Sequence, residues 1–376
     1  MRDQAILALE DGTVFHGLSI GVKGVVTGEV VFNTSISGYQ EILTDPSYFN
    51  QIITFTYPHI GNVGVNIDDY ESEKIYSSGL IIRDLPTLSS NWRSTSSLSD
   101  FLVRHNTVGI SDIDTRKLTR VIRSKGALRG CIIAGKKIEP QEGIRLSKSA
   151  SSLKGMDLAK EVTTKHIYEF KKNSYLFDNN IKKENLHIVA IDFGVKKNIL
   201  RLLFDKVTRV TVVPAKTSFS EIASLSPDGI FLSNGPGDPE PCDYAIKTIK
   251  DALSENVPIF GICLGHQLLC LACGAKTNKM KFGHHGANHP VIDLKSKKVF
   301  ITSQNHGFTV DPESLGKNIE ITHLSLFDNT IQGIQVANTQ SFSFQGHPEA
   351  SPGPKDIEAL FSKFINNITN KNNNLK

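Results

Sequence analysis

The sequence predicts a two-domain α/β protein, with a β-rich α/β domain first and a parallel sheet covered by helices on both faces second. Three observations lead to this prediction. The chain has 376 residues, which is more than one ordinary domain holds. Residues 1–150 alternate apolar and polar side chains between many turn glycines. From residue 187 onward, continuous apolar runs alternate with helical patterns, which is typical of a parallel sheet buried on both faces.

In the first domain, residues 24–32 and 51–56 are rich in Val, Ile and Phe and predict strands. Helical patterns are fewer. The clearest covers residues 114–124, where Asp114 is a candidate N-cap that precedes the first apolar-periodic residue. We expect a β-rich domain over residues 1–150.

A change in composition marks the junction between the domains. Residues 151–186 are polar and lysine-rich, and they end in a run of Asn, Lys and Glu. Such a stretch is typical of a linker. The predicted organisation is therefore a domain over 1–150, a linker region over 151–186 and a second domain over 187–376.

The second domain contains an alternating series of strands and helices. Predicted strands cover residues 187–192, 207–213, 229–233 and 257–262. A helix is predicted over 196–204, and further helical segments lie between the other strands. In parallel sheets, ligands bind at the carboxyl ends of the strands, so chemistry is expected where these strands end.

At the end of the fourth of these strands, Cys263 stands between Gly261 and Gly265. This Gly-x-Cys-x-Gly pattern is that of a nucleophile elbow, a sharp strand-to-helix turn that leaves no room for side chains two residues either side. The following helix N-terminus carries a partial positive charge, which stabilises a negative sulfur. Cys263 is therefore a candidate nucleophile, although a lone buried cysteine is more often a small core hydrophobe.

A candidate base for this nucleophile lies near the C-terminus. A β-prone run leads to His347, followed by Pro348 and Glu349. A carboxylate two residues after the histidine can orient the imidazole and stabilise its charged form. The backbone N–H of Leu264 and one from the glycine-rich loop 234–237 are candidate donors to an oxyanion.

Other chemistries are less well supported. Cys270 and Cys273 have half the spacing of a zinc site, but no second pair completes it. His284, His285 and His289 lie among glycines without nearby carboxylates, which favours a shaped loop over a metal site. We expect no metal and no cofactor on this chain.

Composition restricts the setting. The net charge of +4 is too balanced to indicate nucleic-acid binding. No apolar run approaches the length of a membrane span, and the N-terminus has no signal-peptide pattern. Five cysteines, an odd number, indicate reduced thiols and predict a cytoplasmic protein.

These motifs together resemble the class I (triad) glutamine amidotransferases. The resemblance rests on Gly261 to Gln267 with His347, Pro348 and Glu349, and it covers residues 187–376. Residues 38–48 (GYQEILTDPSY), 56–62 (TYPHIGN) and 233–239 (SNGPGDP) resemble the small, glutamine-hydrolysing subunit of carbamoyl phosphate synthetase. The resemblance then spans nearly the whole chain.

The resemblance implies a flavodoxin-like parallel sheet in the second domain and a catalytic triad of Cys263, His347 and Glu349. It also implies that a further set of residues binds the substrate glutamine. That set comprises Ser47, Gly235, Gly237, Leu264, Gln267, Asn305, Gly307 and Phe308. Ser47 is the member that comes from the first domain.

The resemblance further implies a division of labour between two chains. The sequence contains no recognisable nucleotide-binding loop. The family's partner is a large synthetase subunit that binds ATP with divalent metal and uses bicarbonate, in a heterodimer or a higher assembly. This chain would supply ammonia from glutamine for carbamoyl phosphate, a precursor in arginine and pyrimidine biosynthesis.

Two other functions remain open from the sequence. The chain could be the amidotransferase subunit of another synthetase, although a first domain of about 150 residues is more than such a subunit needs. It could also be a cysteine peptidase or esterase of the same fold. A non-catalytic scaffold is disfavoured by the intact Cys, His and Glu.

Overall fold

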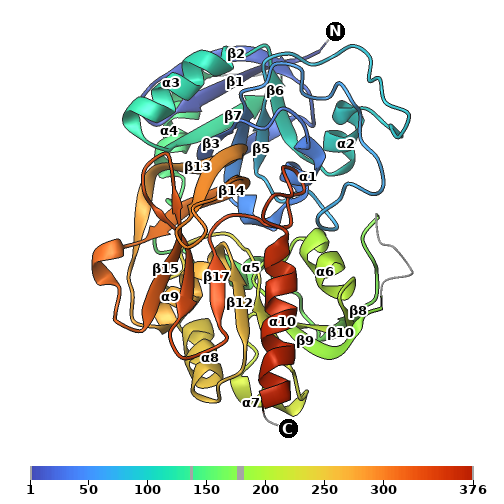
Figure 1. The fold of residues 1–376 in the computed structure, drawn as a ribbon. Helices are drawn as coiled ribbons and strands as arrows, with labels where there is room; N and C mark the ends of the chain where they lie inside the picture. The colour runs from blue at the N-terminus through green and yellow to red at the C-terminus, as the bar shows by residue number, and fades with distance from the viewer. Residues whose placement is uncertain (1, 136–138, 176–181, 375–376) are drawn as a thin grey trace. The chain divides into compact units, whose positions relative to one another are not determined.

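The computed structural model describes residues 2–135, 139–175 and 182–374 (Figure 1). The chain forms two compact units. The first comprises Met1–Lys154 with Lys281–Gly286, and the second comprises Gly155–Met280 with Ala287–Lys376. In the ranges described, we find no helix with the length and apolar character needed to cross a membrane.

Among the described residues of the first unit, seven strands close into a barrel in the order β1-β2-β6-β5-β4-β3-β7. The strands are β1 (Gln4–Leu9), β2 (Val14–Ser19), β3 (Gly24–Asn33), β4 (Gln51–Phe55), β5 (Gly79–Ile81), β6 (Val108–Ser111) and β7 (Leu128–Ala134). The predicted strands at 24–32 and 51–56 are confirmed as β3 and β4. The closure of the sheet was not predicted, because pairing between distant strands leaves no local pattern.

The barrel interior follows from side-chain alternation along the strands. Leu7 and Leu9 of β1 share one buried cluster with Val30 and Phe32 of β3, and side chains from all seven strands join this cluster. Ile6, the residue directly before Leu7, packs instead in a separate cluster on the other face of β1. Successive side chains of a strand point to opposite faces, so the sheet is buried on both sides here.

Short helices accompany the barrel. They are α1 (Tyr39–Thr44), the 3₁₀ turn η1 (Pro46–Tyr48), α2 (Leu98–Arg104), α3 (Thr115–Lys125) and α4 (Pro140–Ser149). The predicted helix at 114–124 is confirmed as α3, and Asp114 is its N-cap: its carboxylate accepts a hydrogen bond from the Lys117 N–H at 2.8 Å.

The second unit is built on a mixed sheet in the order β14-β13-β15-β16-β17-β12-β11-β9-β10-β8. Its parallel part contains β9 (Glu184–Asp192), β10 (Val207–Pro214), β11 (Gly229–Leu232), β12 (Ile259–Ile262) and β17 (Phe342–Phe344). Numbered along the chain, these five strands lie in the order 2-1-3-4-5, which is the flavodoxin-like arrangement. The predicted fold class is confirmed.

Helices cover both faces of this parallel part (Figure 1). Val189 and Ile191 of β9 pack in one cluster with side chains of α7, α8 and α9, whereas Ile188 and Ala190 pack in another with α6 and α10. These helices are α6 (Lys197–Phe204), α7 (Phe219–Ser224), α8 (Asp243–Ser254), α9 (Leu264–Ala272) and α10 (Ala359–Asn374). Burial on both faces explains why the strands are continuous apolar runs in the sequence.

Beyond β17 the sheet continues with antiparallel strands, which the sequence did not predict. They are β13 (Thr277–Asp293), β14 (Val299–Val310), β15 (Ile319–Ser325) and β16 (Ile331–Val336), with the 3₁₀ turn η2 (Pro312–Ser314). The connection from β15 to β16 is residues 326–330, which is too short for the crossover that a parallel pair requires.

The segment predicted as a linker contains regular structure. Among its described residues lie α5 (Ala159–Val162) and β8 (Tyr168–Phe170), and β8 pairs antiparallel with β10 at the edge of the sheet. Both elements fall in the second unit. The boundaries at 1–150, 151–186 and 187–376 stay a prediction.

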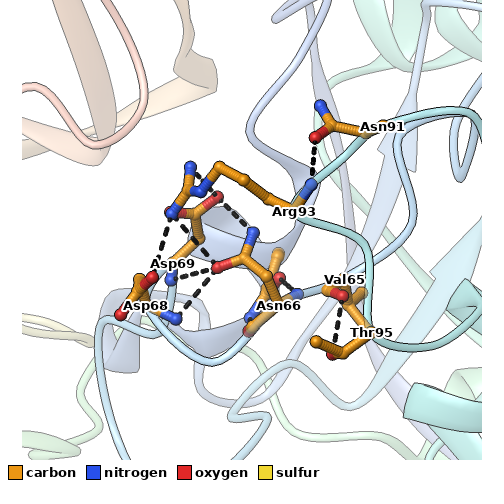
Figure 2. Close-up of polar contacts among 8 residues, drawn as sticks. Val65, Asn66, Asp68, Asp69, Asn91, Arg93 and Thr95 are labelled. Carbon is orange, nitrogen blue, oxygen red and sulfur yellow. Dashed lines mark hydrogen bonds and ion pairs between the residues drawn. The ribbon is translucent and has the colours of Figure 1, made fainter.

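In the first unit, an arginine joins two long loops between β4 and α2 (Figure 2). The Arg93 guanidinium donates to Asp69 at 2.8 Å and to the Asn66 side-chain oxygen at 3.3 Å. Next to this cluster, the backbone N–H of Thr95 donates to the Val65 carbonyl at 2.8 Å. The ion pair is only about 30% exposed, so solvent screens it less than a surface pair.

We predict that Arg93→Met loosens these two loops without unfolding the barrel. Removing a network of partly buried charge-assisted bonds costs about 1 kcal/mol, which lowers the hydrogen-exchange protection of the Val65 and Thr95 amides by about fivefold. Arg145→Met is the matched control, because the Arg145–Glu142 pair is exposed and its loss should change no amide in these loops. Unchanged protection in Arg93→Met would contradict the prediction.

Candidate active site

Cys263 lies at the sharp turn between β12 and α9, as the elbow pattern predicts. Its backbone has φ 53° and ψ −104°, a conformation that non-glycine residues rarely adopt. A Cβ at Gly261 would lie 2.5 Å from the Gly265 carbonyl oxygen, and a Cβ at Gly265 would lie 2.3 Å from the Leu232 carbonyl oxygen. Both positions therefore require glycine for the chain to turn this tightly.

Hydrogen bonds on either side hold the strained turn in place. The Cys263 N–H donates to the Phe344 carbonyl of β17 at 3.0 Å, and the Cys263 carbonyl accepts from the Gln267 N–H at 3.1 Å. The sulfur lies 3.4 Å from the Asn305 carbonyl oxygen. Backbone strain of this kind costs of order 1–3 kcal/mol and persists only where the surroundings fix it.

His347 and Glu349 form a buried pair in the loop after β17. The His347 Nδ1 lies 2.7 Å from Glu349 Oε1, and the two side chains are 2% and 0% exposed. The backbone N–H of His347 donates to the Ser303 carbonyl at 2.8 Å, which fixes the loop against β14. Among the described residues, no partner lies within hydrogen-bond geometry of His347 Nε2, although Cys263 is near enough to raise the pKa of the ring. This leaves the second ring nitrogen available for proton transfer.

A third buried group, Lys196, contacts Glu349, and the sequence pattern did not predict it. Its Nζ donates to Glu349 Oε1 at 2.9 Å and to the Ala350 carbonyl at 2.6 Å. Its backbone N–H donates to the Asn234 side-chain oxygen at 3.1 Å. Lysines are rarely buried, so a single lysine after an apolar run gave no signal that it would be only 3% exposed.

The charges of this cluster support one another. Burial lowers the pKa of His347, but Glu349 and Cys263 outweigh burial and raise it to about 10. Burial raises the pKa of Glu349, but Lys196 and His347 outweigh burial and lower it to about 2. Because the His347 pKa is raised in the folded state, its contribution to stability is complete below pH 6.5 and is lost as the pH rises through about 10.

The topology explains how residues far apart in sequence meet here. The four neighbouring parallel strands β9, β11, β12 and β17 all end at the same edge of the sheet. Lys196 follows β9, the loop 233–237 follows β11, Cys263 follows β12, and His347 with Glu349 follows β17. This edge is where flavodoxin-like folds bind their ligands.

The glycine-rich loop after β11 lies against the elbow. A Cβ at Gly235 would lie 2.1 Å from the Phe193 carbonyl oxygen and 2.9 Å from the Leu264 side chain, so the loop needs glycine at this point. Gly237 has φ 91°, which also favours glycine. Leu264 is the first residue of α9, and a helix leaves the N–H groups of its first turn without internal partners. The Gly265 N–H donates to the Ser233 carbonyl at 3.0 Å, so the Leu264 N–H is the candidate oxyanion donor of this turn.

The structure brings some of the predicted glutamine contacts together. The Gln267 side chain donates to the Phe308 carbonyl at 2.9 Å, and the Asn305 carbonyl contacts the Cys263 sulfur. Gly307 lies between Asn305 and Phe308 on β14. Ser47 lies in η1 of the first unit, where its N–H donates to the Asp45 side chain. The glutamine-binding roles of all these residues stay predictions.

The two cysteines considered for a zinc site lie in the hydrophobic core. Cys270 is fully buried in α9, and Cys273 follows that helix in the same core. Over the described part of the chain, we find no group of three or more His, Cys, Asp or Glu side chains arranged to hold a metal ion.

Comparisons with known proteins agree with this geometry. Residues 7–132 match the family described as carbamoyl-phosphate synthase small chain, CPSase domain, and residues 189–367 match glutamine amidotransferase class-I. Among solved structures, a glutamine amidotransferase from Thermotoga maritima is 19% identical with a TM-score of 0.36, covering 50% of this chain and 86% of its own. That structural likeness is too weak to carry an argument.

Two curated relatives match nearly from end to end. The carbamoyl phosphate synthase small chain of Pasteurella multocida is 59% identical, covering 99% of this chain and 97% of its own. That of Photorhabdus laumondii is 60% identical, covering 97% of this chain and 96% of its own. The chain therefore belongs to the carbamoyl phosphate synthase small chain family and carries a class-I glutamine amidotransferase domain.

Proposed function

We propose that this chain hydrolyses glutamine to glutamate and ammonia through a triad of Cys263, His347 and Glu349, and that the ammonia is used by a large partner chain to make carbamoyl phosphate. One observation carries the proposal. A strained elbow cysteine, a buried His–Glu pair with Nδ1 and Oε1 2.7 Å apart, and a glycine-rich loop lie at adjacent strand ends of one sheet.

The first half of the reaction forms a thioester. The Cys263 sulfur attacks the side-chain carboxamide carbon of glutamine, and the carbonyl oxygen becomes an oxyanion. The Leu264 N–H and a glycine N–H of the 235–237 loop stabilise this oxyanion. Removing one such donor costs about 3–4 kcal/mol of the barrier. His347 gives its proton to the departing nitrogen, which leaves as ammonia.

The second half releases glutamate. His347, now neutral, takes a proton from water as the water oxygen attacks the γ-glutamyl thioester carbon. The C–S bond breaks, and the Cys263 sulfur is restored. Glu349 holds the Nδ1 side of the ring throughout and stabilises its charged form, while Lys196 holds Glu349 in its charged form.

The ammonia has a destination because of its chemistry. Free ammonia in neutral water becomes mostly ammonium, which lacks the lone pair needed for attack. The relatives are named small chains, which supports a large partner chain as the site of use. We propose that the partner binds ATP with divalent metal, activates bicarbonate and accepts the ammonia directly. Carbamoyl phosphate from this pair would enter arginine and pyrimidine biosynthesis in the cytoplasm.

Replacing the nucleophile tests the proposal. In the complex with the large chain, Cys263→Ser should abolish glutamine-dependent carbamoyl phosphate synthesis and leave ammonia-dependent synthesis intact. Cys273→Ser is the matched control, since this partly exposed thiol after α9 lies outside the triad. Release of glutamate by Cys263→Ser at the unmodified rate would refute the proposal.

The electrostatics of the triad predict a second outcome. Glu349→Gln removes a charge that raises the pKa of His347, while burial continues to lower it. The midpoint of the His347 titration, followed by NMR of the ring, should therefore fall from about 10 by about 1–3 pH units. Glutamine hydrolysis should slow with it. Glu358→Gln, a partly exposed carboxylate, should leave the His347 midpoint unchanged. An unchanged midpoint in Glu349→Gln would contradict the assignment.

A further inference from the structure

A buried glutamine, Gln345, contacts the side chain of Gln267 and has no part in the triad. Gln267 lies one helical turn after Cys263 on α9, so the two residues share a face of the helix. Gln345 follows β17 two residues before His347. Gln267 is 3% exposed and Gln345 is 0% exposed.

The orientation of the Gln267 amide follows from its partners. The Phe308 carbonyl, 2.9 Å away, can only accept a hydrogen bond, so the Gln267 atom that faces it must be the NH₂ group. The same NH₂ group lies 3.1 Å from Gln345. Both of its hydrogens are then in use, and the facing atom of Gln345 must be its acceptor, Oε1.

This arrangement leaves one group unused on each glutamine. The Gln345 NH₂ is buried and has no hydrogen-bond partner among the described residues. Burying an unpartnered donor is unfavourable, so Gln345 is oriented by what its oxygen does for Gln267. The Gln267 Oε1, for its part, makes no hydrogen bond to a described residue and remains available as an acceptor.

We infer that Gln345 is a positioning residue for substrate selection: together with the Phe308 carbonyl it locks the Gln267 amide with Oε1 toward the substrate, where that oxygen accepts a hydrogen bond from the α-ammonium group. An ammonium group carries three donors and no acceptor, so only this orientation of Gln267 suits it. An unlocked amide could turn its NH₂ group toward the ammonium and repel it. The inference rests on the proposed function, because glutamine must be the substrate.

The test compares L-glutamine with glutaramate, which has the same carboxamide but no α-amino group. In the complex with the large chain, Gln345→Met should raise the KM for L-glutamine by about tenfold and change kcat by less than about threefold. The kcat/KM for glutaramate should stay nearly constant. The preference for L-glutamine should therefore fall by about tenfold.

Two further variants separate positioning from general loosening of the core. Gln332→Met removes another fully buried glutamine, on β16, whose side chain contacts Gln304 and Thr330 but not Gln267, and it should keep the preference for L-glutamine. Gln345→Glu keeps an acceptor oxygen in either protonation state and should also keep it. It provides the test if Gln345→Met does not fold.

The outcomes are distinct. Retention of the full preference for L-glutamine by Gln345→Met, an equal loss in Gln332→Met, or a loss of about tenfold in Gln345→Glu would each overturn the inference. Failure of the proposed function would look different, because the unmodified complex would then hydrolyse no glutamine.

Discussion

The candidate active site depends on the close backbone packing around Cys263. Gly261 and Gly265 lie so near to neighbouring carbonyl oxygens that even a methyl group at either position would force the elbow apart. This packing sets the direction of the sulfur and places the start of α9 directly behind it. The candidate oxyanion donors, the face shared with Gln267 and the contact with the Asn305 carbonyl all follow from the same turn.

Around the turn, charge is distributed in a chain of alternating sign. Lys196, Glu349 and His347 are each almost fully buried, a situation that would be unfavourable for any one of them alone. Together they satisfy one another, and the pKa of Glu349 falls while that of His347 rises. Lys196 follows β9, whereas His347 and Glu349 both follow β17, so this charge arrangement depends on the fold that brings the two strand ends together.

The sequence alone was enough to predict a structural feature where the cause of that feature is local. Asp114 caps its helix, and the glycines around Cys263 predict the elbow, because both effects act within a few residues. It was insufficient where the cause is distant pairing. The barrel closure and the burial of Lys196 depend on contacts between segments over a hundred residues apart. The antiparallel extension of the sheet depends on pairing across shorter separations, such as Val291 with Ser325. Hydrogen-bond partners such as those of Gln345 are set by the same long-range packing.

One feature of the first unit bears on how the chain folds as it is made. Residues 281–286 belong to that unit: the Lys281 carbonyl accepts from the Ala127 N–H, the His285 carbonyl accepts from the Thr34 N–H, and Phe282 packs against Phe32. When only the first 150 residues have been synthesised, the barrel domain therefore still lacks residues 281–286. That domain reaches its final set of contacts only after most of the second unit has been translated.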